Sequence, residues 1–253
     1  MGEWIASRQN SRYRGWKLLA ESAGERRARG LALLDGEHLL EAFLASGGVP
    51  LQVLVCEEPD AAAWQQRCPQ AEVVLLTRPL FDAISPVRTP TGVMAVVQPP
   101  VWPQQASHFA VLLERIQDPG NLGAMLRSAA AAGVDSVWLS DECADAWSPK
   151  TLRGGMGAHF ALRIVEQADL VAVARDFPGL VCATALDAAE DLYQADLRGP
   201  LAFVFGNEGA GLSPALRAAV SASLRIPMPG RMESLNVAAA LAVCLFERVR
   251  QTR

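Results

Sequence analysis

The stretch "FAVLLERIQDPGNLGAMLRSAAAAGVDSVWLS", residues 109–140, holds two apolar segments separated by a turn and a helix-like segment. Residues 109–113 are apolar without interruption, which is typical of a strand buried on both faces. Pro119 and Gly120 mark the turn, and the small and apolar residues that follow favour a helix. Residues 134–140 predict the next strand. This order of strand, helix and strand predicts two parallel strands of one sheet.

The same alternation continues to the end of the chain, so we expect an α/β fold with a mainly parallel sheet covered on both faces. The predicted strands are residues 161–165, 180–186, 201–206 and 223–228. The predicted helices begin at Ser148–Pro149, cover residues 170–176, begin again at Ser213–Pro214, and run from about Ser234 to Arg250.

A proline-rich segment, "QPPVWPQQAS" at residues 98–107, interrupts the periodic pattern. It predicts two domains, residues 1–100 and 108–253, joined by a linker at 101–107. The first domain is predicted to be a small α/β domain without an obvious catalytic cluster. Its predicted helices are residues 12–29 and 37–46, and its predicted strands are 31–35, 51–56, 72–77 and 92–98.

Composition narrows the class of protein. The chain has 253 residues, of which 51% are hydrophobic, and five cysteines without C-x-x-C spacing. These cysteines predict neither a disulfide framework nor a metal site and fit a reducing cytosol. The first residues lack the apolar run of a signal peptide, and the longest apolar run, residues 237–246, is about half of the roughly 20 residues that a membrane span needs. We therefore expect a soluble, cytoplasmic protein that does not bind membranes.

The net charge of −4 is unevenly distributed, because residues 1–30 carry seven basic and three acidic side chains. A basic segment on an acidic protein can contact phosphates. A solvated helix surface explains the same pattern, and both interpretations stay open. The candidate RNA-binding residues are Arg8, Arg12, Arg14, Arg26, Arg27 and Arg29.

Three loops with unusual chemistry follow predicted strands, at the position where ligands bind in open α/β sheets. The first is the turn at Asp118–Asn121. The second, "FGNEGAGLS" at residues 205–213, has glycines spaced G-x-x-G-x-G, the reverse of the dinucleotide fingerprint. The third is "IPMPGRMESLN", residues 226–236, where Ser234 is either a functional residue or the cap of the final helix. That helix is apolar on nearly every face, which predicts burial in its own core or against a second subunit.

Taken together, the three loops resemble the three motifs of the SpoU/TrmH-type RNA ribose 2′-O-methyltransferases, in the SPOUT class. The motifs are Asn121-x-Gly123-x-x-x-Arg127 after "ERIQDPG", then "FVFGNEGAGLS", then "IPMPGRMESLNVAAALAVCLFE". The resemblance covers residues 108–251. The N-terminal half resembles, more loosely, a substrate-binding domain similar to certain ribosomal proteins.

The resemblance implies a C-terminal domain with a trefoil knot, S-adenosyl-L-methionine as cofactor, and a homodimer formed through the C-terminal helix region. The apolar character of the final helix makes Leu241 and Leu245 candidates for that interface. It implies an active site of Asn121, Arg127, Glu208, Ser234 and Asn236. It implies a cofactor site of Thr184, Leu186, Gly206, Asn207, Gly209, Ile226, Met228, Leu235 and Asn236. Family members commonly have a serine where this chain has Gly155, which is a departure from the pattern.

We therefore expect methylation of a ribose 2′-hydroxyl in structured ribosomal or transfer RNA. Arginine has a pKa above about 12, so Arg127 is expected to position a phosphate and the hydroxyl, and the proton acceptor stays open. An RNA-binding protein of the same fold without catalytic activity is the alternative. A nucleotide-dependent oxidoreductase is disfavoured, because no G-x-G-x-x-G follows an early strand.

Overall fold

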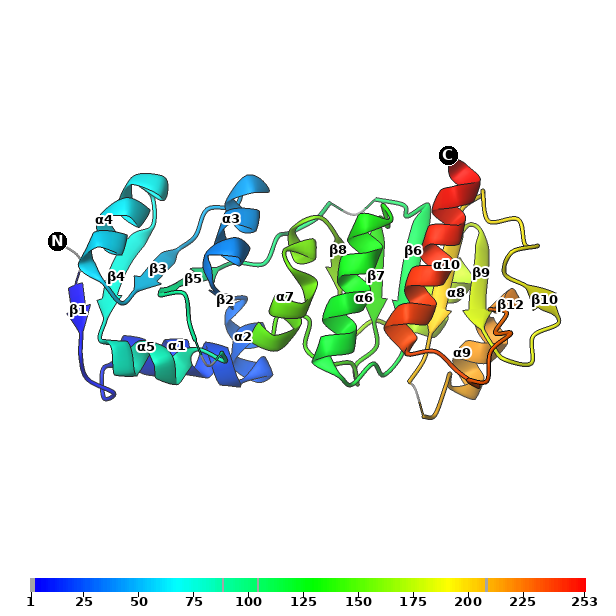
Figure 1. The fold of residues 1–253 in the computed structure, drawn as a ribbon, viewed down its shortest axis with the longest axis horizontal. Coiled ribbons are helices and arrows are strands. Elements are labelled where there is room, and N and C mark those ends of the chain that lie inside the picture. The colour runs from blue at the N-terminus through cyan, green and yellow to red at the C-terminus, as the bar shows by residue number, and fades with distance from the viewer. Residues whose placement is uncertain (1–2, 88, 104, 208) are drawn as a thin grey trace. The chain divides into compact units, whose positions relative to one another are not determined.

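The computed structural model describes residues 3–87, 89–103, 105–207 and 209–253 (Figure 1). These residues pack as two compact units. The first unit extends to Val101 and includes Trp147–Phe160, and the second contains Trp102–Ala146 and Ala161–Arg253. The sequence prediction had placed the segment Trp147–Phe160 in the C-terminal domain.

The first unit is built on a five-stranded mixed sheet. Its strands follow the order β1 (Glu3–Ile5), β4 (Glu72–Leu76), β3 (Gln52–Val55), β5 (Val93–Val97) and β2 (Ala32–Asp35). β1, β4 and β3 are parallel, whereas β5 is antiparallel to β3 and β2. The helices are α1 (Ser11–Glu21), α2 (Ala23–Arg29), α3 (Glu37–Ala45), α4 (Glu58–Arg67), α5 (Arg78–Ile84) and α7 (Pro149–Gly155), with a 3₁₀ turn at Ala158–Phe160.

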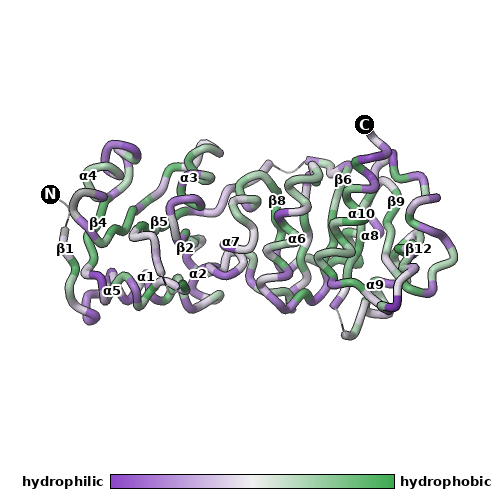
Figure 2. Tube along the Cα trace, viewed as in Figure 1, coloured by the Kyte–Doolittle hydropathy of each residue, from purple (hydrophilic) through white to green (hydrophobic). Residues whose placement is uncertain are grey.

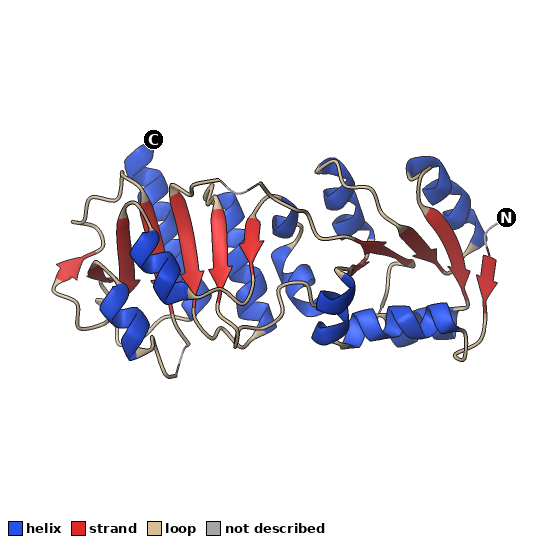
Figure 3. Ribbon diagram, turned by 180° about the vertical axis from the view of Figure 1, so that it is seen from behind, coloured by secondary structure: helices blue, strands red, loops and turns tan. Residues whose placement is uncertain are grey.

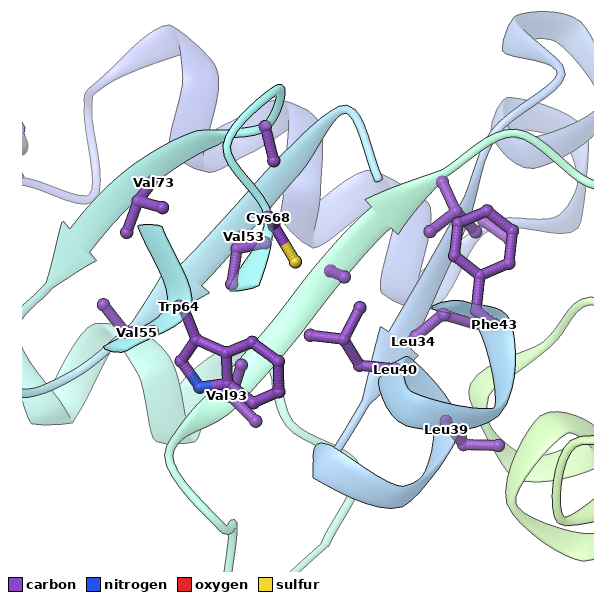
Figure 4. Close-up of a cluster of buried hydrophobic side chains, with 14 of the residues drawn as sticks. Leu34, Leu39, Leu40, Phe43, Val53, Val55, Trp64, Cys68, Val73 and Val93 are labelled. Carbon is purple, nitrogen blue, oxygen red and sulfur yellow. The ribbon is translucent and has the colours of Figure 1, made fainter. Parts of the chain in front are cut away.

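Both faces of this sheet are covered, which explains why its strands are apolar throughout. Alternate strand residues contribute to two hydrophobic clusters. On one face α1 and α5 bury Trp16 and Phe81. On the other, α3 and α4 bury Phe43 and Trp64 against strand residues such as Val53 (Figure 4).

The second unit is built on a seven-stranded, all-parallel sheet, which confirms the mainly parallel sheet predicted from the sequence. Its order is β10 (Glu190–Asp191), β12 (Ala222–Arg225), β9 (Leu180–Thr184), β11 (Leu201–Phe205), β6 (Phe109–Leu113), β7 (Ser136–Leu139) and β8 (Arg163–Val165). Helices α6 (Pro119–Ala131) and α10 (Val237–Thr252) pack together on one face, and α8 (Leu170–Asp176) and α9 (Pro214–Ala219) pack together on the other (Figures 1 and 3).

The core of the second unit lies along its central strands. Every residue of β6 and β11 is buried, and β6 is among the strands coloured hydrophobic in Figure 2. Leu112, Ala183 and Val204 pack with Leu170 of α8 and Leu216 of α9. This two-sided burial explains why continuous apolar runs, rather than alternating ones, mark these strands.

Two predicted helices differ from the structure. The helix predicted at residues 12–29 is divided at Ser22, whose side chain accepts a hydrogen bond from Glu25 N–H and so caps α2. The final helix begins at Val237 rather than near Ser234. Strands β1 and β10 and helices α4 and α5 had no counterpart in the sequence prediction. The knotted threading that the resemblance implies stays a prediction.

Within the described residues, no helix is long and apolar enough to cross a membrane. The described part of the chain also contains no group of side chains arranged as metal ligands. The five cysteines form no disulfide, and burial raises the pKa of the Cys182 and Cys244 thiols to about 12.

Candidate active site

The sheet of the second unit brings the three loops to one edge. β12, β9, β11 and β6 are neighbours and parallel, so their carboxyl ends meet at the same edge. The candidate residues for the active site and the cofactor site lie in the loops that leave these strands and in helix α6, which follows the first of them. Segments separated by more than a hundred residues in sequence are therefore adjacent in the fold.

The first loop is held by local hydrogen bonds. Asp118 caps α6 by accepting a hydrogen bond from Asn121 N–H at 2.7 Å, and Pro119 occupies the first turn. Before the cap, Arg115 has a φ of 54°, a left-handed conformation that is uncommon for a residue with a Cβ. Ser140, from the loop after β7, accepts a hydrogen bond from Arg115 N–H at 2.9 Å.

The first and third motifs meet through two asparagines. Asn236 Nδ2 donates to Asn121 Oδ1 at 3.0 Å. Asn236 is also the N-cap of α10, because its Oδ1 accepts hydrogen bonds from Ala238 N–H and Ala239 N–H. The cap of the final helix is thus Asn236 and not Ser234. The N-termini of α6 and α10, with their partial positive charges, lie side by side at this contact.

The second loop is a compact turn organised by Asn207. Its Oδ1 accepts hydrogen bonds from Gly209 N–H and Ala210 N–H, and its Nδ2 donates to Arg115 O at 3.1 Å. Asn207 therefore holds the second loop and connects it to the first. Glu208, a candidate active-site residue, lies outside the described residues.

The glycines of the second loop differ in their structural importance. A Cβ at Gly206 would lie 2.5 Å from the backbone carbonyl of Gly211, so no side chain fits there without movement of the backbone. Gly211 has a φ of 64°, which favours glycine. A Cβ at Gly209 would meet only Asn207 Oδ1 at 3.5 Å, an ordinary contact.

Glu114 is a positioning residue that sequence reasoning missed. Its Oε2 accepts a hydrogen bond from Ser213 N–H at 2.7 Å, and Ser213 in turn caps α9. Glu114 therefore fixes the end of the second loop to the end of β6. The sequence pattern that could have identified Glu114 is an acidic residue directly after an uninterrupted apolar run, residues 109–113.

The candidate cofactor residues outside the glycine loop follow β9 and β12, and Leu235 and Asn236 lie directly before α10. Thr184, Ile226 and Met228 are half-buried. Leu186 is 60% exposed and Leu235 is 42% exposed, which is unusual for leucine. Apolar side chains exposed beside strand ends provide the surface that a partly apolar ligand covers.

Arg127 is exposed on α6, and no carboxylate of the described residues forms an ion pair with it. It lies six residues beyond Asn121, which corresponds to about 9 Å along the helix axis and about 120° around it. Asn121 and Arg127 of one chain therefore point in different directions. The structure brings Asn121 and Asn236 together but does not bring Arg127 to them.

The six arginines predicted to bind RNA differ in exposure and in their partners. Arg8, Arg14 and Arg27 are exposed. Two others form ion pairs, Arg12 with Glu72 at 2.6 Å and Arg29 with Glu25 at 2.8 Å.

Arg26 requires a correction. It is buried, and its guanidinium donates to Leu19 O and Ala20 O at the end of α1. These carbonyls have no partner within their helix, so Arg26 satisfies the helix terminus and is not available to RNA.

The residues predicted for the dimer interface are also corrected by the structure. Leu241 and Leu245 are fully buried within their own chain, so they cannot form a dimer interface. The exposed large apolar residue of α10 is instead Phe246.

Gly155, which replaces the family's serine, is buried at the end of α7 in the first unit.

The all-parallel sheet, with its three loops connected at the carboxyl edge, agrees with the SPOUT-type RNA methyltransferase class predicted from the motifs. Residues 108–246 match the SpoU rRNA Methylase family, and residues 10–95 match the MRM3-like substrate binding domain. The chain belongs to the SpoU rRNA Methylase family.

Relatives similar along the whole chain support this assignment. The 23S rRNA (guanosine(2553)-2′-O)-methyltransferase RlmP of Bacillus subtilis is 34% identical, over 96% of this chain and 97% of its own length. The 23S rRNA (uridine(2479)-2′-O)-methyltransferase of Streptomyces viridochromogenes is 29% identical, over 98% and 92%. The crystal structure of the SpoU methyltransferase AviRb from Streptomyces viridochromogenes, in complex with AdoMet, superposes with a TM-score of 0.85 at 28% identity, covering 96% of this chain and 98% of that one.

Proposed function

We propose that this protein transfers a methyl group from S-adenosylmethionine to a ribose 2′-hydroxyl of ribosomal RNA. The observation that carries the proposal is the hydrogen bond between Asn121 and Asn236, which joins the first and third motifs at the carboxyl edge of the sheet. The full-length relatives from Bacillus subtilis and Streptomyces viridochromogenes, by name, act on 23S rRNA, which favours ribosomal over transfer RNA.

The residues at this edge fit the cofactor. No side chain fits at Gly206 beside the Gly211 carbonyl, and exposed apolar surface is provided by Leu186 after β9 and by Leu235 before α10. We expect the loops after β9, β11 and β12 to hold S-adenosylmethionine, with Thr184, Ile226 and Met228 as further walls. When bound, the cofactor supplies a sulfonium methyl group that is already electrophilic.

The protein's own contribution is then mainly alignment of the ribose hydroxyl with that methyl group. Arg127 has the planar donor geometry to hold an RNA phosphate and the hydroxyl together. Asn121 and Asn236 fix the helix N-termini beside the site. The proton acceptor stays open. His108 precedes β6 and so lies at the opposite edge of the sheet, and His38 and His159 belong to the first unit.

We further propose a homodimer that completes the site. Arg127 and Asn121 of one chain point in different directions, so a site that uses both residues needs Arg127 from one subunit and Asn121 from the other. Phe246, which is 46% exposed on α10, is the apolar side chain that we expect in the contact between the two C-terminal helices.

Sedimentation velocity tests the dimer. At micromolar concentration we expect a dimer, and Phe246→Glu should raise its dissociation constant at least about tenfold, because it places a charge in an apolar contact. Val49→Glu, at an apolar residue of the first unit that is 52% exposed, is the matched control and should leave the dimer intact. A wild-type protein that is monomeric and fully active would contradict the shared site.

The exposed arginines of the first unit give a second prediction. Replacing Arg8, Arg14 and Arg27 together with glutamine should weaken rRNA binding and reduce the slope of log K against log salt by about 0.7–0.9 per lost phosphate contact. The control replaces Arg78, Arg175 and Arg198, which are also exposed, with glutamine. Filter binding at several salt concentrations measures both. Equal slopes in the two triple variants would show that the first set is only solvated.

The function itself is tested by mapping 2′-O-methylated nucleotides in ribosomal RNA from cells with and without this protein. We expect loss of a methylated ribose from 23S rRNA. An unchanged map would favour the alternative, an RNA-binding protein of the same fold without activity.

A further inference from the structure

The first unit contains a cavity of about 560 Å³ that is separate from the three motifs. It lies where β2 ends and α3 begins. Gly36, with a φ of 101°, turns the chain there. The loop before β5 and helix α7 complete the walls. A volume of this size falls within the range of small-ligand sites, about 300–1,000 Å³. The lining residues important for the argument are Asp35, Leu39, Val87, Thr89, Arg153 and Met156.

Asp35 gives the cavity an acceptor that needs a donor. Its Oδ2 accepts a hydrogen bond from Ser85 Oγ at 2.8 Å, whereas its Oδ1 is buried and has no hydrogen-bond partner among the described residues. Buried acceptors in proteins almost always have a partner. Burial raises the pKa of the Asp35 carboxyl, and the Ser85 hydrogen bond and the charge of Arg153 oppose that shift.

The other charged groups of the cavity restrict the kind of ligand. Glu37 and Glu41 line it as well, and both form ion pairs with Arg67, at 3.1 and 2.7 Å. His38 lies on the first turn of α3, and Arg153 is exposed on α7. Among the described lining residues, the carboxylates of Asp35, Glu37 and Glu41 outnumber the single arginine, Arg153, which disfavours a phosphate group inside the cavity. A neutral ring with N–H donors at its edge suits Asp35.

The remaining walls suit a flat, partly apolar ring. Leu39, Val87 and Met156 provide apolar surface, and the guanidinium plane of Arg153 can stack on a ring. Proteins that read RNA sequence commonly take up unpaired bases in this way, with stacking on the faces and hydrogen bonds at the edges. Guanine presents adjacent N1–H and N2–H donors to a carboxylate.

We propose that this cavity binds one unpaired base of the ribosomal RNA substrate, with guanine the best fit, and that Asp35 accepts its edge hydrogen bonds. The inference rests on the proposed function, because it assumes an RNA substrate. It assigns to the first unit a base-reading site that is independent of the exposed arginines and of the methyl-transfer site.

Asp35→Asn tests the proposal, since it keeps the shape of the side chain but replaces one acceptor with a donor. With protein-free 23S rRNA from cells lacking this protein, the variant should raise KM about tenfold, in line with the value of one base contact. Its kcat and its affinity for S-adenosylmethionine should be unchanged. Asp82→Asn, at an exposed carboxylate of α5, is the matched control and should keep a normal KM.

Arg153→Gln provides a second variant. Because Arg153 is exposed whereas Asp35 is half-buried, this substitution should leave the fold intact, and it should also raise KM. A normal KM in both variants would overturn the proposal, whatever the stability of Asp35→Asn. Failure of the proposed function would appear differently, as absence of methyl transfer by the wild-type protein. In that case rRNA affinity, measured by filter binding, replaces KM as the test of the cavity.

Discussion

Arg127→Lys is expected to fold normally and bind S-adenosylmethionine normally, yet to lose methyl transfer by about 100-fold or more. Lysine keeps the positive charge but lacks the planar fork of donors that can hold a phosphate and a hydroxyl together. Because Arg127 is exposed and forms no ion pair with the described carboxylates, its replacement removes little from the fold. Single-turnover transfer of labelled methyl into 23S rRNA measures the loss.

Arg175→Lys is the matched control, an exposed arginine on α8, on the opposite face of the same sheet (Figure 3). Its transfer rate should be normal. If Arg127→Lys also transfers methyl at a near-normal rate, Arg127 is only a solvated helix residue, and the active site must be assigned to other side chains. Partial recovery on mixing Arg127→Lys with an Asn236→Ala variant would support a site formed between two subunits.

Gly206→Ala is expected to abolish detectable binding of S-adenosylmethionine. Its Cβ would lie 2.5 Å from the Gly211 carbonyl carbon and oxygen and 2.8 Å from Leu212 N, so the backbone of the second loop would have to move. Asn207 connects that loop to Arg115, just before the first loop, so the displacement would extend to both loops. Isothermal calorimetry measures the affinity, and circular dichroism checks the fold.

Gly209→Ala is the control within the same loop. Its new Cβ would make only an ordinary contact, and we expect an affinity within about threefold of wild type, as for a tolerated exposed substitution. Equal loss in both variants would mean that the loop tolerates no side chain anywhere. If Gly206→Ala binds S-adenosylmethionine with normal affinity, the second loop is not part of the cofactor site.

The sequence predicted the parallel sheet well because burial on both faces leaves continuous apolar runs. β6 and β11 are such runs, and the helix at Leu170–Asp176 was also predicted with its observed bounds. Short or weakly patterned elements were missed. β1 has three residues, and α4, "EPDAAAWQQR", has no clear apolar stripe, so only the surrounding fold stabilises them.

The sequence motifs predicted which residues form the candidate site, but not the contacts that these residues make with one another. The bond between Asn236 and Asn121 joins residues 115 positions apart, and it depends on a sheet order in which sequential strands are not neighbours. A charge pattern also cannot distinguish Arg26 from Arg27. The former is buried because α1 ends in carbonyls that need donors, whereas the latter is exposed. The pattern likewise treats Gly206 and Gly209 as equivalent, although only Gly206 lies against backbone.

The most direct test of the account uses wild-type protein, labelled S-adenosylmethionine and 23S rRNA from cells that lack this protein. After the reaction, the rRNA is digested to nucleosides and the labelled product is identified. We expect label in one 2′-O-methylated nucleoside of the 23S rRNA, and little or none in a parallel reaction with transfer RNA. Label on a base, or no label under conditions where calorimetry shows bound S-adenosylmethionine, would contradict it.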